Sequence, residues 1–68
     1  MKLVKEYLCD NNTPSDNEIE ECISIANSED CIVKLTWFFP YNGWHELFVK
    51  NGMTFEECKD KLPKCYGI

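Results

Sequence analysis

The chain has 68 residues, of which 44% are apolar and 28% charged, and its formal net charge is −5. This length leaves room for one domain, residues 1–68, and the composition is that of a folding chain rather than a disordered one. A domain this small buries only about 60% of the surface that its unfolded chain exposes. We therefore expect a single compact domain of modest stability, the kind that disulfides, a metal or a second subunit often reinforce.

The charges are unevenly placed along the chain. All seven basic residues are lysines, and eight of the twelve acidic residues lie between Glu6 and Asp30, where no lysine occurs. Phosphate neutralisation needs a basic stripe and guanine recognition favours arginine, so this pattern argues against direct nucleic-acid binding. It favours attraction toward a protein partner with a basic surface.

No stretch of the sequence has the length and apolarity of a membrane-spanning helix or of a signal-peptide core. We therefore expect no membrane partner. A cytoplasmic location follows as the expectation, and in that compartment thiols stay reduced.

Two helices are predicted in the amino-terminal part. Four apolar residues recur there at helical spacing: Leu3, Val4, Tyr7 and Leu8. This spacing predicts a short helix over residues 2–9. A second helix is predicted to open at Thr13-Pro14-Ser15, where a hydroxyl cap is followed by Pro. Ser15 also stands three residues before Glu18 as in a capping box, and the helix is expected to end near residues 27–28. Its apolar stripe consists of Ile19, Cys22, Ile23 and Ala26.

From Cys31 onward the apolar residues alternate, which predicts an antiparallel β-hairpin with strands at about 31–39 and 44–50. We expect a three-residue loop over residues 41–43 with Gly43 in a left-handed conformation. The implied register pairs Phe39 with His45, Trp37 with Leu47 and Leu35 with Val49. A two-residue turn would instead place Glu46 and Lys50 among the core residues, at a high desolvation cost.

A third helix is predicted over about residues 54–62, because Thr54 and Glu57 repeat the capping-box spacing and Pro63 ends the helical pattern. The last residues, 64–68, form a short extended tail that either adds an edge strand or covers the core. The order helix, helix, hairpin, helix and tail predicts a small α+β domain.

Five cysteines and one histidine are the candidates for thiol or metal chemistry. No two cysteines have the Cys-x-x-Cys spacing of a zinc or redox motif. We interpret them as buried structural thiols, and we expect no catalytic residue, no metal and no cofactor. The alternative is a thiol- or metal-dependent protein that uses four dispersed side chains: Cys31, Cys58, Cys65 and His45.

The hairpin face opposite the core is unusually apolar for a surface exposed to water. The residues that we predict to bind a partner there are Phe38, Tyr41, Trp44, Glu46 and Phe48. Exposed aromatic patches mark interaction surfaces, and Trp and Tyr are favoured anchor residues in them. Two alternatives stay open at this point. The first predicted helix covers this face, or a second copy of the chain covers it in a homodimer.

Acidic residues on the second predicted helix add to the proposed partner surface: Asp16, Glu20 and Glu21. We expect them to steer the protein toward a basic partner, an effect that salt would weaken. One alternative is a merely solvated helix face, with acids near the helix start favoured by the helix dipole. Another is that the acids imitate a row of phosphates and occupy a nucleic-acid channel.

In size, acidic charge, lack of enzyme motifs and expected α+β build, the chain resembles the small acidic accessory proteins of phages and mobile elements, including anti-CRISPR inhibitors. The resemblance implies a stoichiometric inhibitor that binds a host defence complex in the host cytoplasm. No motif is matched, so no binding residue carries over. The residues themselves predict a non-enzymatic protein-binding module; a structural subunit of a larger assembly is the other possibility.

Overall fold

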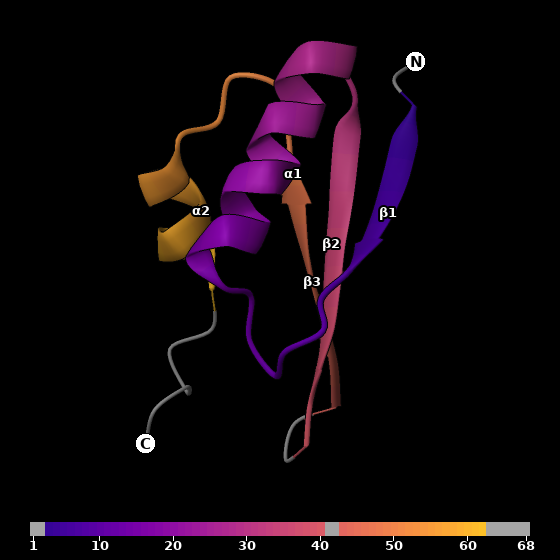
Figure 1. Ribbon diagram of the computed structural model, residues 1–68, viewed down its shortest axis with the longest axis vertical. Helices are drawn as coiled ribbons and strands as arrows, with labels where there is room; N and C mark the ends of the chain where they lie inside the picture. Colours follow the sequence, from indigo (N-terminus) through magenta and orange to yellow (C-terminus); the bar gives the residue numbers. More distant parts are fainter. Residues whose placement is uncertain (1–2, 41–42, 63–68) are drawn as a thin grey trace.

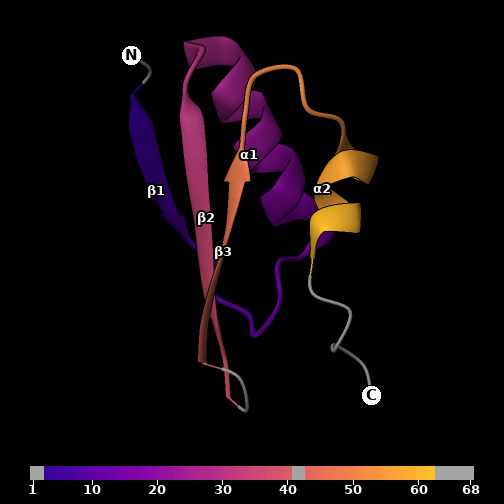
Figure 2. The ribbon, with the colours of Figure 1, turned by 180° about the vertical axis from the view of Figure 1, so that it is seen from behind.

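The computed structural model describes residues 3–40 and 43–62, which form two helices on one side of a three-stranded sheet (Figures 1 and 2). In chain order the elements are β1 (Val4–Leu8), α1 (Asp16–Glu29), β2 (Ile32–Phe39), β3 (Gly43–Val49) and α2 (Phe55–Lys61). The central strand is β2, which pairs with β1 in parallel and with β3 antiparallel. The domain is therefore a small α+β fold with a mixed sheet.

The first element is a strand, so the prediction of two amino-terminal helices followed by a hairpin is wrong. Val4 pairs with Ile32 and Leu8 with Thr36, and the N–H of Cys9 extends the ladder by donating to the carbonyl of Thr36 at 2.9 Å. An isolated helix of eight residues is marginal in water. A strand in the same place satisfies the backbone groups along one edge of β2, and this distant pairing decides the structure.

The hairpin register differs from the predicted one by two residues. Trp37 pairs with His45 rather than with Leu47, and Phe39 pairs with Gly43. Because side chains alternate with a period of two, an even shift leaves the same side chains on each face of the sheet. Gly43 has a φ of 84°, in the left-handed region expected for it. Residues 41 and 42 of the predicted loop lie outside the described residues.

Both helices begin at capping boxes in the positions that the sequence indicates. The Ser15 hydroxyl accepts from the N–H of Glu18 at 3.2 Å, and the Thr54 hydroxyl accepts from the N–H of Glu57 at 3.1 Å. In each box the glutamate carboxylate accepts in return from the N–H of the capping residue. These reciprocal bonds satisfy backbone N–H groups at the start of the helix that have no hydrogen-bond partner within the helix itself. The predicted tail at 64–68 lies outside the described residues.

The core fills the space between the helices and the inner face of the sheet. Trp37 of β2 is its largest side chain and is fully buried. The other buried core residues are Cys9, Ile19, Cys22, Ala26, Cys31, Val33, Leu35, Leu47, Val49 and Cys58. Within residues 3–40 and 43–62, the helices fall short of the length and apolarity needed to cross a membrane.

Candidate protein-binding surface

The sheet has one face covered by both helices and one face that no other element of the described chain covers (Figure 2). We call the uncovered face the outer face. Its side chains come from alternate positions of the three strands: Val4, Glu6, Leu8, Ile32, Lys34, Thr36, Phe38, Trp44, Glu46 and Phe48. Of the six large apolar side chains that are strongly exposed among the described residues, all except Leu3 belong to this face. The apolar exposure of the described residues is therefore concentrated on one surface.

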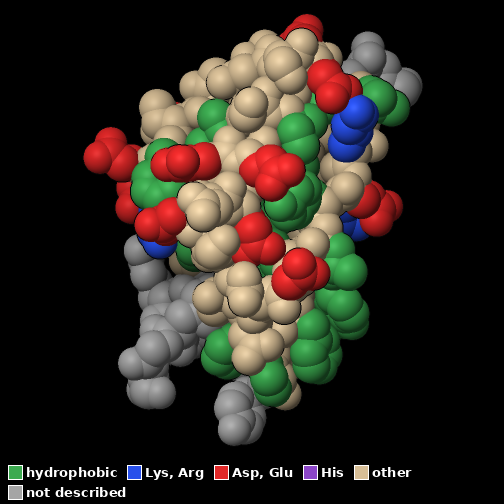
Figure 3. Space-filling view, viewed as in Figure 1, with side chains coloured by type: hydrophobic (Ala, Val, Ile, Leu, Met, Phe, Trp, Pro, Cys, Tyr) green, Lys and Arg blue, Asp and Glu red, His purple; other side chains and the backbone are tan. Residues whose placement is uncertain are grey.

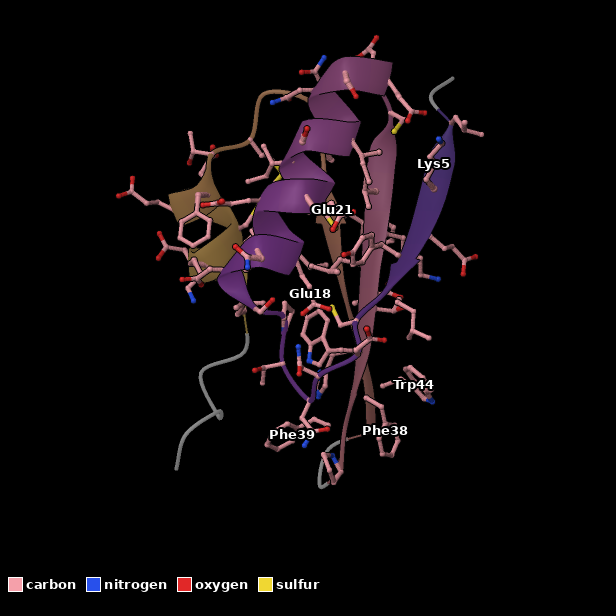
Figure 4. All side chains as sticks on the ribbon, viewed as in Figure 1. Lys5, Glu18, Glu21, Phe38, Phe39 and Trp44 are labelled. Atoms are coloured by element: carbon pink, nitrogen blue, oxygen red, sulfur yellow. The ribbon has the colours of Figure 1, made fainter. Side chains whose placement is uncertain are left out.

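An aromatic pair stands at the hairpin end of the outer face. Phe38 and Trp44 are direct cross-strand partners, with ring centroids 5.3 Å apart and planes inclined by 67°. They are 46% and 66% exposed, and Figure 4 shows both on one side of the strands with Phe39 on the other. Edge-to-face packing fixes the orientation of the rings without hiding them. The two rings thus present a preformed apolar surface to solvent.

Phe48 is exposed on the same face but does not join the aromatic pair. It lies opposite Lys34, four residues along β3 from Trp44, which is about 14 Å of extended chain. Glu46 stands between the two rings on the strand. The structure therefore separates the predicted aromatic residues into a pair and a single ring. Tyr41 lies outside the described residues.

Strand β1 adds a feature that the sequence pattern does not predict. With Trp44, its side chains enclose a groove of about 540 Å³ across the sheet, which we call the outer groove. The groove is lined by Glu6, Leu8, Lys34, Thr36, Trp44, His45 and Glu46. The available signal was the period-two alternation of Val4, Glu6 and Leu8, which the helical spacing of the same segment obscured.

Charges of both signs line the outer groove. The Nζ of Lys34 lies 3.6 Å from the Oε1 of Glu46. Glu6 is the β1 neighbour of Lys34 in the ladder, so two carboxylates and one ammonium group line the groove. The three groups together leave one negative charge at the edge of the apolar walls.

The acidic residues that we predicted as steering groups lie on the other side of the molecule, among the acidic side chains that gather over the helices (Figure 3). Asp16 forms an ion pair with Lys59 at 3.1 Å, and the hydroxyl of Tyr7 donates to Glu21 at 2.8 Å. This hydrogen bond to a carboxylate, together with partial burial, raises the pKa of Tyr7. Asp16 and Glu21 thus link elements of the fold, while Glu20 is exposed on α1.

Four of the thiols are free and buried: Cys9, Cys22, Cys31 and Cys58. Burial raises the pKa of both Cys9 and Cys22 to about 12, which disfavours the reactive thiolate. The ring of His45 stacks on Trp37, with centroids 5.7 Å apart. Within the described parts of the chain, no three His, Cys, Asp or Glu side chains are placed to hold a metal ion, and Cys65 lies outside those parts.

The outer face accordingly combines exposed aromatic rings, a groove and charges of both signs. No family model, curated protein or solved structure matches the chain. A functional assignment is therefore argued from the geometry of this face.

Proposed function

We propose that the chain is a non-enzymatic protein-binding module that docks a partner protein on its outer face. The observation that carries the proposal is the exposure of Phe38 and Trp44 on a sheet face that no described element covers. A small domain has few aromatic residues with which to build a core. Two that point to solvent in a fixed mutual orientation match the anchor residues of protein interfaces, where Trp is the most enriched type.

The reactive side chains support binding rather than catalysis. A cysteine nucleophile needs a low pKa and access to substrate, whereas Cys9 and Cys22 are buried with raised pKa values. The single histidine packs against Trp37 on the inner side of the sheet. The outer face carries apolar groups and charges but no thiol, which suits recognition better than covalent chemistry.

We also propose a cytoplasmic location for the protein. Four thiols of the described chain are unpaired and packed in the core as small apolar side chains. A compartment that keeps thiols reduced suits a core of this kind, since oxidised pairing would disturb its packing.

Capture of the partner from the native host, followed by affinity measurements with the purified partner, tests the proposal. The partner is first identified by mass spectrometry on material retained by the immobilised wild-type protein. Calorimetry then compares the wild type with Trp44→Ala and Phe38→Ala. Anchor residues in a desolvated interface cost about 2 kcal/mol or more when truncated, so each variant is expected to weaken binding about thirtyfold.

The matched control is a pair of leucines with equal exposure on opposite faces. Leu8 and Leu3 are both 64% exposed, but Leu8 belongs to the outer face. Leu3 immediately precedes β1, and the alternation of side chains along that strand assigns Leu3 to the opposite face. Leu8→Ser is expected to weaken binding and Leu3→Ser to leave it unchanged, with thermal unfolding confirming that each variant folds. A partner that binds all the variants as tightly as the wild type contradicts the proposal, as does a failure to retain any specific partner.

A further inference from the structure

The outer groove has the shape of a slot for one long side chain. Its apolar lining comes from Leu8 at the end of β1 and from Trp44 on β3, which lies one cross-strand row nearer the hairpin turn. Its floor on β2 is the short side chain of Thr36, whose hydroxyl donates to the carbonyl of Tyr7 at 3.4 Å. Strands β1 and β3 flank the central strand, so their backbones lie about 10 Å apart. An extended side chain can therefore lie between the walls with its stem against apolar surface.

The charges of the groove select a cation. Lys34 is already paired with Glu46, and Glu6, its neighbour on β1, adds a second carboxylate to the groove lining. The groove therefore carries one unbalanced negative charge, in a domain of net charge −5. The indole face of Trp44 attracts a cation in its own right.

We propose that the outer groove binds an arginine side chain of the partner protein. The planar guanidinium stacks on the Trp44 indole and donates to the Glu6 and Glu46 carboxylates, while the aliphatic stem lies along Leu8. Arginine fits better than lysine because its planar head stacks on aromatic rings, donates along two edges and is less strongly hydrated. This inference rests on the proposed function and adds the chemistry of the partner to it.

A second copy of the chain cannot supply this side chain. The sequence contains no arginine, and all seven of its basic residues are lysines. Face-to-face pairing of two outer faces would also bury the Lys34–Glu46 pair at the centre of the interface, at a desolvation cost. A different protein is therefore the occupant that the charges favour.

Titrations with blocked tripeptides test the inference without the natural partner. The probe is acetyl-Gly-Arg-Gly-amide, and its matched control carries citrulline, which keeps the shape of arginine but lacks its charge. Binding is followed by NMR at the indole N–H of Trp44, assigned by its loss in Trp44→Leu. We expect the arginine peptide to shift this resonance and the backbone amides of Leu8 and Glu46, and the citrulline peptide to shift them far less.

Charge variants locate the recognition. Glu6→Gln is expected to weaken arginine-peptide binding about threefold, the effect of one exposed ion pair. The double variant Glu6→Gln/Glu46→Gln should remove the preference for arginine over citrulline. Glu56→Gln on α2 removes the same charge on the opposite side and should change nothing.

Equal shifts with both peptides, or no shift with either, overturn the inference. So does a Trp44 resonance that moves with protein concentration alone, because a second copy then occupies the groove. The proposed function fails separately: it falls when partner binding ignores Trp44→Ala and Phe38→Ala. Partner binding that requires Trp44 but is unaffected by Glu6→Gln/Glu46→Gln retains the function and refutes the arginine assignment.

Discussion

Glu18 is expected to stabilise the protein more than Glu57, although the two occupy the same position in the two capping boxes. Both carboxylates accept from the N–H of their capping residue at 2.9 Å. The carboxylate of Glu18 also accepts from the N–H of Asp10 at 3.1 Å and from the side-chain amide of Asn11 at 3.2 Å. Glu18 therefore holds the connection between β1 and α1 as well as capping the helix.

The difference can be worked from these bonds. Each capping-box bond contributes about 1 kcal/mol, and the two exposed bonds to the connection contribute about 0.5 kcal/mol each. Glu18→Ala should therefore cost about 2 kcal/mol and Glu57→Ala about 1 kcal/mol. For a domain of this size that difference lowers the melting temperature of Glu18→Ala by about 4–8 °C more than that of Glu57→Ala.

Urea unfolding at pH 7, followed by circular dichroism, measures both losses, and because the two substitutions are chemically identical their helix-propensity terms cancel. Amide exchange adds a local test, since the N–H of Cys9 donates to Thr36 at the end of β1 and should exchange faster in Glu18→Ala alone. Equal free-energy losses in the two variants would refute the reasoning. They would show that Glu18 acts only as a cap and leaves β1 unaffected.

The same carboxylate predicts a loss of stability in acid. Partial burial acts to raise the pKa of Glu18, but the hydrogen bonds from Ser15, Asn11 and Asp10 outweigh it and hold the pKa below its ordinary value. A depressed folded-state pKa means that this contribution is complete above the unfolded pKa of about 4.3 and is lost as the pH falls through the folded value. The stability difference between wild type and Glu18→Gln should therefore shrink below about pH 4. A difference that stays constant from pH 7 to pH 3 would contradict this assignment.

Three further predictions concern single side chains. Acrylamide should quench the fluorescence of the exposed Trp44 but not that of the buried Trp37. The variant Trp44→Phe should therefore show one poorly quenched component. Strong quenching in that variant would mean that Trp37 is accessible to solvent. Iodoacetamide at pH 8 should not modify Cys9 or Cys22 until guanidinium unfolds the protein, because burial raises the pKa of both thiols to about 12. Rapid labelling of either thiol in the native protein, found by peptide mass mapping, would disprove this prediction. Gly43→Ala should lower the free energy of unfolding in urea by about 1 kcal/mol. The added Cβ meets no atom within 4 Å, so only the positive φ of 84° opposes the substitution. An unchanged unfolding midpoint would show that the turn relaxes.

Local chemistry made parts of the fold predictable from sequence. The capping boxes at Ser15 and Thr54 involve residues three positions apart, so the sequence contains everything that they need. The faces of the hairpin follow from the alternation of its side chains, and they survive a register shift of two residues. Since both registers place the same side chains inside, hydrophobic pattern alone could not choose between them.

Other parts of the fold could not be predicted from the sequence because they depend on pairing between distant segments of the chain. Strand β1 exists because its backbone bonds to a strand that begins 28 residues later, and its short apolar pattern fits a helix equally well. The outer groove was missed for the same reason, since Glu6 and Leu8 reach it only as part of that strand. The ion pair of Asp16 joins residues 43 positions apart, so its structural role could not be read from α1 alone.

The parallel pairing of β1 with β2 also has a kinetic meaning. Within the sheet, the β2–β3 hairpin closes a short loop, whereas β1 pairs with a strand that follows the whole of α1. Contacts that close a long loop form after those that close a short one, because the larger entropy cost must be met first. The groove walls contributed by Glu6 and Leu8 are thus the last part of the outer face to assemble. A partner that binds in the outer groove therefore distinguishes the completely folded domain from one in which β1 has not yet paired.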